Sequence, residues 1–341
     1  DGIYKTTDGG DTWEEKSKAN GIQDMEIKPD DPNILYASTR NYGRNYIYRS
    51  IDMGETWQNV YDMTAGRRIA IAVTPAEPDY VYAIVAELNN TFKSLLRSED
   101  AGETWNVMSE DDSQTPDVLT RYFGFRDSTS GQAHYDLAID AAPWDKDLIF
   151  VGGINIWKSS DGGKNWKQVS YPYHNDRDLA IIHVDIHDLI FHEKTNELYA
   201  GHDGGIDRTS DLGNNWEEVS DNMDITQFYR MGVSRTEDDL VIAGCQDNGT
   251  NLFDDGRWEE VYGSDGMECI INYNNPQRMY ASIYYGRLLR STNRGKNFRH
   301  MFRPDQVGQQ AAWVTPFIMD PQDPSILYVG YNDVFKFDNH G

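Results

Sequence analysis

Cysteine is scarce in this sequence, and long apolar runs are missing from it. Only Cys245 and Cys269 occur in 341 residues, which is too few for a disulfide framework. Both lie among apolar residues, so we expect buried free thiols, with a single bridge between neighbouring repeats as the alternative. No apolar run reaches the roughly 18 residues of a membrane-spanning helix, so we predict no membrane insertion.

Basic residues are also few. Lys and Arg number 31 against 56 Asp and Glu, which gives a formal net charge of -25. Such a surface repels phosphate backbones, so we predict no nucleic-acid partner. The carboxylates serve solubility in the plainest interpretation; the alternative is that some of them collect cations. The chain opens inside a repeat, at DGIYKTTDGG, so we expect further domains of the same polypeptide, and a missing leader says nothing about location.

What the sequence does contain is a repeated hairpin of the form Ser/Thr-x-Asp-x-Gly-x-Thr/Asn-Trp. The copies are KTTDGGDTW (5–13), RSIDMGETW (49–57), RSEDAGETW (97–105), KSSDGGKNW (158–166), RTSDLGNNW (208–216), RSTNRGKNF (290–298) and a worn FDDGRW (253–258). The Gly supplies a backbone conformation that other residues rarely adopt, and the Asp can accept backbone N–H groups across the turn. Because this Asp recurs once per repeat, we interpret it as a turn device and not as a catalytic group.

A second phrase precedes each hairpin and consists of an apolar strand, a turn and another strand. Its seven copies end at Tyr36, Tyr82, Phe150, Tyr199, Ile242, Tyr280 and Tyr328. Units of about 40 to 50 residues with four short strands are typical of propeller blades. The sequence therefore predicts an all-β, seven-bladed β-propeller that forms one domain over residues 1–341, with the repeated hairpin between strands 3 and 4 of each blade.

The two ends of the chain can complete one blade between them. Residues 1–16 supply a third strand, a hairpin and a fourth strand without the first two, so we expect them to close the last blade and remove a free sheet edge. Both VFKF near the C-terminus and GIYK near the N-terminus resemble a third strand. Either one of them is displaced, or the natural protein continues past residue 341.

The hairpins make the chain resemble the Asp-box, or BNR-repeat, propellers over nearly its whole length. That superfamily includes sialidases, two-propeller xyloglucan hydrolases, sortilin-type receptors and a photosystem II assembly factor, so the resemblance implies the fold but no single function. A narrower resemblance rests on the stretches at 152–163, 183–191, 199–211, 225–234, 244–253 and 263–271. They look like secreted Bacteroidetes BNR-repeat proteins, which are exported by the type IX system and often called glycosyl hydrolases. This resemblance implies an extracellular or cell-surface location.

Two enzyme subclasses can be compared with the sequence. A sialidase resemblance would require a Phe/Tyr-Arg-Ile-Pro motif, which does not occur. The xyloglucan hydrolases carry a catalytic Asp in a segment resembling A-R-T-D-x-G-G, and the matching segment here, 37–50, has Arg40 and Asn41 without an Asp. A glycosidase needs only two carboxyl groups about 5 to 10 Å apart, so the 56 acidic residues leave this alternative open.

The densest group of chemically active residues is HVDIHD. On a strand, His183, Asp185 and His187 would point to one face because side chains alternate. With Asp188 and with Asp203 from the next strand, they could ligate a divalent metal such as Ca²⁺ in the central channel. The alternative is a hydrogen-bonded polar layer without metal. Further polar residues predicted at the same mouth, as ligand-binding residues, are Asp136, Gln246, Asp247, Asp265 and Glu268.

The last candidate is a long insertion between residues 109 and 135. A loop of this length in a compact domain is usually functional or disordered. Its exposed aromatic and basic side chains suit contact with a protein or glycan, and a lid over the neighbouring blade is the alternative; they are Arg121, Tyr122, Phe125 and Arg126.

Taken together, these features favour a secreted or surface-displayed binding propeller, one module of a larger bacterial protein, that recognises a protein or a glycan. The alternative is a glycoside hydrolase that uses paired carboxylates at the central mouth. An assembly factor that holds a partner protein is a third hypothesis. No cofactor other than the candidate divalent metal is implied.

Overall fold

The computed structural model describes residues 2–112, 114–120, 131–172, 179–220 and 223–341. The chain divides into two compact units, residues 1–221 and 222–341, and each is described by itself. Apart from one short 3-10 turn, η1 (Pro304–Val307), the regular elements of the described residues are all β-strands. The all-β prediction is thus confirmed. Within the same residues, no helix is long and apolar enough to span a bilayer.

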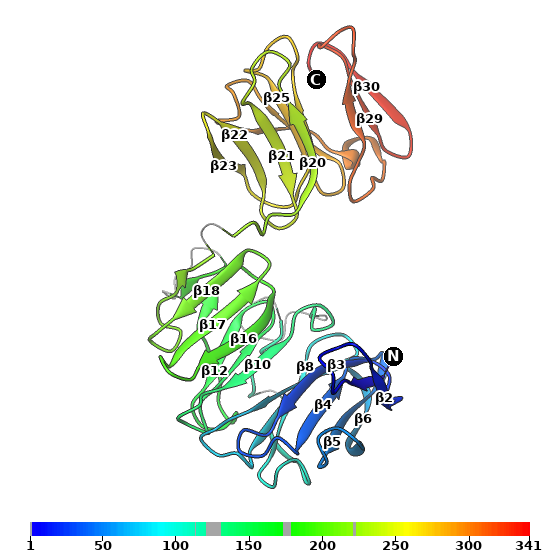
Figure 1. Cartoon of the computed structure of the whole chain (residues 1–341). Helices are drawn as coiled ribbons and strands as arrows, with labels where there is room; N and C mark the ends of the chain where they lie inside the picture. Colours follow the sequence, from blue (N-terminus) through cyan, green and yellow to red (C-terminus); the bar gives the residue numbers. More distant parts are fainter. Residues whose placement is uncertain (1, 113, 121–130, 173–178, 221–222) are drawn as a thin grey trace. The chain divides into compact units, whose positions relative to one another are not determined.

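Unit 1 is made of antiparallel sheets whose strands follow one another in chain order (Figure 1). The largest sheet contains β3 (Ile22–Ile27), β4 (Leu35–Thr39), β5 (Gly43–Ser50), β6 (Gln58–Val73), β7 (Val81–Glu87), β8 (Phe92–Ser98) and β9 (Asn106–Glu110). Two four-stranded sheets follow: β10 (Ala138–Ala141), β11 (Ile149–Gly152), β12 (Ile156–Ser159) and β13 (Lys167–Gln168), then β16 (Ile186–His192), β17 (Glu197–His202), β18 (Gly205–Thr209) and β19 (Glu217–Glu218). The short strands β14 (Ser170–Tyr171) and β15 (Ala180–Ile181) form a parallel pair between them.

Strand β6 belongs to two repeats at once. Its first part pairs with β5 and its second part, from Gly66, pairs with β7. The repeat pattern predicts two separate strands here, but no proline or loop divides them, and the chain turns only at Ala65, whose φ is 60°. The seven-stranded sheet therefore contains two four-strand repeats that share this strand.

Unit 2 continues the same meander. Its sheets are β20 (Phe228–Val233), β21 (Val241–Cys245), β22 (Thr250–Asp254) and β23 (Arg257–Tyr262), then β24 (Gly266–Ile271), β25 (Met279–Ile283), β26 (Arg287–Ser291) and β27 (Arg299–Phe302), and finally the three-stranded β28 (Phe317–Met319), β29 (Leu327–Gly330) and β30 (Val334–Phe337). Cys245 and Cys269 are buried and both thiols are free, as the sequence predicts by default.

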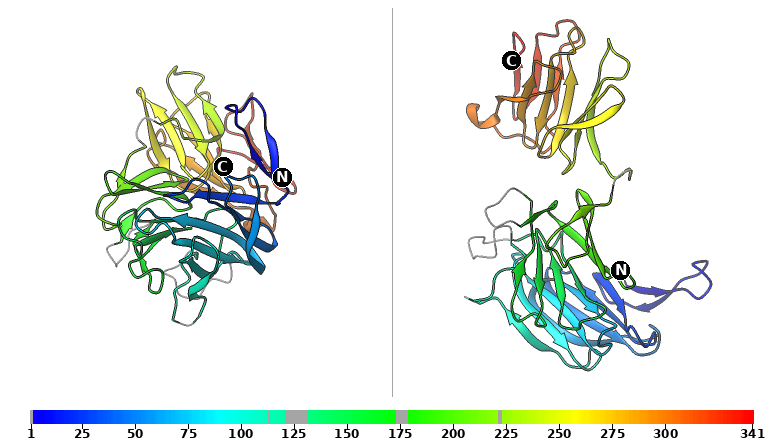
Figure 2. Two further views of the ribbon diagram at one scale, coloured as in Figure 1. Left: turned by 60° about the horizontal axis from the view of Figure 1, so that its bottom comes forward. Right: turned by 90° about the vertical axis from the view of Figure 1, so that its left-hand side faces the viewer.

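The first strands of successive repeats lie side by side within each unit. In unit 1, β3 contacts β6, β6 contacts β10 and β10 contacts β16, and in unit 2, β20 contacts β24, which contacts β28. The core lies between the sheets, where the second strands are almost fully buried; β7, for example, buries six consecutive residues from Val81. Figure 2 shows the twist of these sheets from two further directions.

The repeated hairpins are held by local hydrogen bonds. In the turn between β5 and β6, Asp52 Oδ1 accepts the Thr56 backbone N–H at 2.8 Å, and Asp52 Oδ2 accepts the Thr56 hydroxyl at 2.6 Å. The Ser50 hydroxyl donates to Asp52 and accepts the Gly54 N–H. These bonds hold the pKa of Asp52 down at about 2, well below its ordinary value.

The glycine of most hairpins also lies close to a side chain of the preceding repeat. A Cβ atom built on Gly102 would lie 2.7 Å from the Tyr36 ring on β4, and one built on Gly163 would lie 1.9 Å from Leu95 on β8. By contrast, a Cβ on Gly54 would meet nothing closer than its own hairpin's Trp57, at 3.7 Å. At some copies the repeated turn therefore requires glycine for two reasons, its positive φ and this close approach.

The first hairpin, β1 (Ile3–Lys5) with β2 (Glu14–Ser17), is a two-stranded sheet of its own and is drawn in dark blue in Figure 2. Its Trp13 is 62% exposed, so this tryptophan does not pack into a sheet. Closure of the last blade by residues 1–16, and with it the count of seven blades in one ring, stays a prediction.

Candidate functional site

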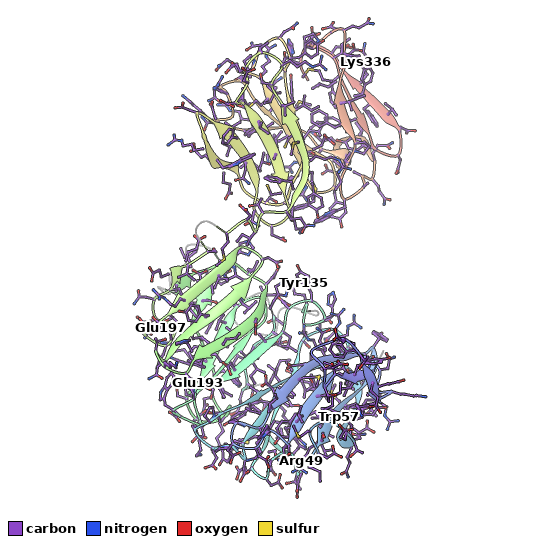
Figure 3. The ribbon with its side chains drawn as sticks, in the orientation of Figure 1. Arg49, Trp57, Tyr135, Glu193, Glu197 and Lys336 are labelled. Carbon is purple, nitrogen blue, oxygen red and sulfur yellow. The ribbon has the colours of Figure 1, made fainter. Side chains whose placement is uncertain are left out.

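The two ends of each sheet carry different turns and connections. The hairpins between strands 3 and 4, and the turns between strands 1 and 2, lie at one end. The turns between strands 2 and 3, and the connections to the next sheet, lie at the other, which we call the loop end. Figure 3 shows Tyr135 at the loop end of unit 1, with Glu193 and Glu197, beside the β16–β17 turn, at the opposite end. All the predicted site residues within the described part of the chain lie at or near loop ends, except Asp188 and Glu268, which lie within inner strands.

Only part of the HVDIHD stretch is a strand, so the predicted alternation is wrong. Strand β16 begins at Ile186, and Asp185 before it has a positive φ of 66°, which turns the chain. The β16–β17 register then shifts between Ile186 and Asp188, so that His187 and Asp188 are both exposed. His183, Asp185 and His187 therefore do not share one strand face.

The turn at Asp185 still gathers several of these side chains into a group that we call the His–Asp cluster: Gln132, Tyr135, Asp136, Asp185, His187 and Asp203. Gln132 Nε2 donates to Asp136 Oδ2 at 3.1 Å and also to Asp185 Oδ1. His187 Nε2 is 2.5 Å from Asp203 Oδ1, and the Tyr135 hydroxyl donates to Asp203 Oδ2 at 2.9 Å.

The ionisation of the cluster follows from its burial. Asp136 is only 1% exposed, and burial, together with the nearby Asp185 carboxyl, raises the pKa of Asp136 to about 8. Burial also raises the pKa of Asp185. The hydrogen bond to Asp203 raises the pKa of His187, while burial of Asp203 is outweighed by its bonds from His187 and Tyr135, which lower the pKa of that carboxyl. The cluster thus places a neutral Asp136 carboxyl beside the hydrogen-bonded pair of His187 and Asp203.

His183 lies next to this cluster with a different set of neighbours. Its ring stacks on that of His202 at a centroid distance of 5.8 Å, and His202 Nε2 lies 2.7 Å from Asp207 Oδ2. A Cβ on Gly204 would lie 2.6 Å from His183 Cγ, which accounts for a glycine in the HDGG turn. In the described residues, no group of three or more His, Cys, Asp or Glu side chains is arranged to hold a metal ion. The metal site stays a prediction that this geometry does not support.

A long acidic groove runs along the inner strands of unit 1. It is lined by segments of β3, β6, β10 and β16, encloses about 800 Å³ and contains the carboxyl groups of Asp24, Glu26, Asp140 and Asp188. Asp24 Oδ2 accepts the Ile71 N–H at 2.8 Å, and Asp140 Oδ2 accepts the Phe191 N–H at 2.6 Å. These two carboxyl groups tie β3 to β6 and β10 to β16.

Burial dominates the acid–base behaviour of the groove. It raises the pKa of Glu26 to about 8, with the charges of the neighbouring carboxylates adding to the effect, and it raises the pKa of Asp140 to about 7. Burial raises the pKa of Asp24 as well, and partial desolvation of the Asp188 carboxyl within the groove raises its pKa although the residue is exposed overall. Glu26 is therefore protonated at neutral pH.

The insertion at 109–135 is tied down at both flanks. Val118, Leu119 and Ala133 are buried in the core of unit 1, and the Arg68 guanidinium donates to the backbone oxygens of Tyr135 and Leu137 at 3.3 and 3.1 Å. The predicted contact residues Arg121, Tyr122, Phe125 and Arg126 lie outside the described residues.

In unit 2 the predicted polar residues come together in part. Gln246 Nε2 donates to Asp265 Oδ1 at 2.9 Å, and the Asp247 backbone N–H donates to the same oxygen at 3.1 Å. Glu268 is not part of this group; its carboxylate lies 3.7 Å from Arg230 Nε, and burial raises its pKa.

The sequence analysis missed the aromatic residues beside Gln246, which we call the aromatic platform: Tyr229, Tyr284, Tyr285 and Trp313. The Tyr229 hydroxyl donates to Gln246 Oε1 and accepts the Trp313 indole N–H at 3.0 Å. Tyr284 stacks on Trp313 with an interplanar angle of 9° and a centroid distance of 5.4 Å, and Tyr285 meets Trp313 edge-on. One signal was available, because Trp313 belongs to no copy of the repeated hairpin.

Comparison with known proteins agrees with the repeat. The BNR-Asp box repeat family model matches residues 156–169. The chain is 28% identical over 204 residues to an oligoxyloglucan-reducing end-specific xyloglucanase of Emericella nidulans, covering 56% of this chain and 23% of that protein. It is 25% identical over 224 residues to a sialidase of Bacteroides fragilis (64% and 37%) and 31% identical over 154 residues to a xyloglucanase of a Paenibacillus species (41% and 14%).

The chain thus spans less than two fifths of the length of these relatives. Among solved structures, it is similar to the GH74 xyloglucanase of Xanthomonas campestris, at 17% identity and a TM-score of 0.44, covering 94% of this chain and 52% of that one. It is also similar to YCF48 of Cyanidioschyzon merolae, at 13% identity and a TM-score of 0.40, covering 94% and 95%. The family-model match and the relatives support the resemblance to BNR-repeat propellers.

Proposed function

We propose that this chain is an extracellular glycan-binding propeller, one module of a larger secreted protein, and that its seven repeats close into one ring. The observation that carries the proposal is the aromatic platform at the loop end of unit 2. There Trp313 is 38% exposed and Tyr285 is 52% exposed, although tryptophan and tyrosine are large apolar side chains. Exposed aromatic residues that are held in place mark binding surfaces.

The chemistry of the platform suits a sugar. Aromatic faces stack on the C–H face of a pyranose ring, and nearby amide and carboxylate groups bond to its hydroxyls. Gln246 and Asp265 supply these groups, and Tyr229 links them to Trp313 by hydrogen bonds. Because several relatives are xyloglucanases, a β-glucan such as xyloglucan is the first ligand to test.

Binding without cleavage is favoured by what the candidate carboxyl groups do. Asp136 is too buried to touch a sugar, and Asp24 and Asp140 are bonded to the backbone. The segment where the resemblance to xyloglucan hydrolases would place a catalytic Asp has Arg40 and Asn41 and no Asp, and the Asn41 Nδ2 donates to the Asn20 carbonyl at 3.0 Å. The Asn41 side-chain amide therefore stabilises the loop around Asn20.

Glycoside hydrolysis is the second candidate, and one observation favours it. Glu26 is protonated at neutral pH, as a general acid must be, and Asp188 lines the same groove. If the chain cleaves a polysaccharide, the variant Glu26→Gln should lose the activity.

One experiment separates the candidates. The purified chain is run by affinity electrophoresis in gels with soluble polysaccharides, xyloglucan first, and the same mixtures are assayed for new reducing ends. We expect retardation without new reducing ends, and a tenfold or greater loss of affinity in Trp313→Ala. Absence of binding to any glycan, with capture of a protein partner instead, would refute the proposal; cleavage that depends on Glu26 would replace it with the second candidate.

A further inference from the structure

A second recess lies beside the aromatic platform in unit 2. It encloses about 480 Å³ between the β25–β26 turn and the segment at 303–311, and we call it the basic pocket. The side chains that matter here are Tyr285, Arg287, Arg303, Asp305 and Gln310. A recess of this size is within the range that holds small ligands.

The charge of the pocket contrasts with that of the chain. The sequence carries 56 acidic and 31 basic residues, yet two arginines and only one carboxylate, Asp305, line this recess. By contrast, Arg294 of the same unit bonds to both Asp254 and Glu237 at 2.6 Å. Across the described residues, neither Arg287 nor Arg303 forms an ion pair. Two unpaired arginines that converge on a pocket fit an anionic ligand.

Contacts within unit 2 position the side chains that line the pocket. Arg287 is steadied by Tyr284, since its guanidinium carbon lies 5.1 Å from the centre of that ring. Tyr285 has a positive φ of 55°, uncommon for an aromatic residue, and its N–H donates to the Trp313 carbonyl at 3.2 Å. The turn therefore presents the Tyr285 ring to the pocket beside the platform.

We propose that the basic pocket selects a carboxylate-bearing sugar, a uronic or a nonulosonic acid, at the end of the bound glycan. Arg287 and Arg303 pair with the carboxylate, Tyr285 stacks on the sugar ring, and Gln310 bonds to a hydroxyl. This inference rests on the proposed glycan-binding function and names the class of ligand that the function prefers.

The test uses matched oligosaccharides and isothermal titration calorimetry on the intact chain. One pair is an oligosaccharide with terminal glucuronate and its analogue with terminal glucose; the other is sialyllactose and lactose. We expect tenfold or greater preference for the acidic member of at least one pair, and the pair that shows it identifies the kind of acid. Arg287→Gln and Arg303→Gln should abolish that preference while leaving affinity for the neutral member within twofold.

A matched control is Arg257→Gln, which removes an exposed arginine from β23, beside the β22–β23 turn at the opposite end of its sheet. It should keep the preference, and thermal melts should show all three variants folded. Arg303→Lys keeps the charge but loses the two-pronged geometry and should retain only part of the preference. Equal affinity for acidic and neutral sugars would overturn this inference and leave glycan binding intact. Absence of binding to every sugar would overturn both.

Discussion

The loop ends of the two units are built from similar connections, but their side chains are arranged differently. In unit 1, the side chains of the His–Asp cluster bond to one another, and Asp136 at its centre is 1% exposed. In unit 2, Gln246 and Asp265 also bond to each other, but the exposed Trp313 and Tyr285 beside them pack into a group of aromatic rings, whereas the unit 1 cluster contains a single exposed aromatic ring, Tyr135.

This difference distinguishes polar side chains that stabilise the fold from a surface that is available to a ligand. A buried cluster whose side chains bond mainly to one another has few polar groups left for a ligand, and its residue with positive φ, Asp185, accepts one of those bonds from Gln132. The aromatic platform also has satisfied polar groups, but its apolar faces remain in water. We therefore assign ligand binding to the loop end of unit 2.

The largest predicted effect concerns how closely neighbouring sheets approach in the two units. Gly201 on β17 and Gly244 on β21 occupy equivalent register positions, opposite Asp188 and Arg230. A Cβ on Gly244 would lie 2.1 Å from the Met267 carbonyl oxygen, whereas one on Gly201 would lie 3.8 Å from Asp188 Cβ. We expect Gly244→Ala to cost about 3 kcal/mol of unfolding free energy and Gly201→Ala under about 1 kcal/mol, measured by urea denaturation.

Equal costs for the two alanines would mean that the close packing of β21 on β24 does not constrain unit 2. Both glycines have negative φ, so backbone strain does not complicate the comparison.

The acidic groove of unit 1 predicts a pH effect. The residue of β10 that occupies the same register position as Glu26 of β3 is Asp140. In unit 2 the corresponding residues carry no carboxyl group; they are Gly232 on β20 and Ile270 on β24. Since the folded-state pKa of Glu26 is raised to about 8, unfolding releases its proton between about pH 4.5 and 8, and stability falls as pH rises through this window. Glu26→Gln should remove part of that fall, on the order of 2 kcal/mol by pH 8.

Unfolding curves in urea at pH 5 and pH 8 measure this difference. Glu193→Gln, which removes an exposed carboxyl from the same groove, serves as the control. A Glu26→Gln variant with the same loss of stability between the two pH values as the parent would show that the Glu26 carboxyl is charged in the folded state.

The smallest effect concerns the hairpins that both units share. Asp161 Oδ1 accepts the Asn165 N–H at 2.9 Å, and in the sixth copy Asn293 Oδ1 accepts the Asn297 N–H at 3.0 Å. Asp161→Ala should therefore lower the unfolding free energy by about 1 kcal/mol, and Asp161→Asn should retain most of it. Thermal melts compare the two; an asparagine as damaging as alanine would contradict the turn role.

The hairpins could be predicted from sequence because their bonds are local. Asp52 reaches residues two and four positions away, so the letters of one motif contain the whole arrangement. The all-β class followed from the spacing of these motifs. The shared strand β6 could not be predicted, because a continuous strand and two strands with a short break have the same alternation.

The sites were harder to predict for a physical reason. The positive φ of Asp185 and the register shift in β16 decide which side chains face each other, and neither is written in the alternation of HVDIHD. The aromatic platform joins Tyr229, Tyr284 and Trp313, which lie far apart in the sequence, so only the folded chain brings them together.

One titration tests directly whether the chain binds its ligand through unit 2, as we propose. Trp313 and Tyr135 are both aromatic residues at loop ends, 38% and 47% exposed. Titration of the bound polysaccharide into Trp313→Ala and Tyr135→Ala compares the two ends in the intact chain. We predict a tenfold or greater loss of affinity for Trp313→Ala, about 1.4 kcal/mol, and less than a twofold change for Tyr135→Ala. Loss of affinity in Tyr135→Ala with full binding in Trp313→Ala would contradict the assignment.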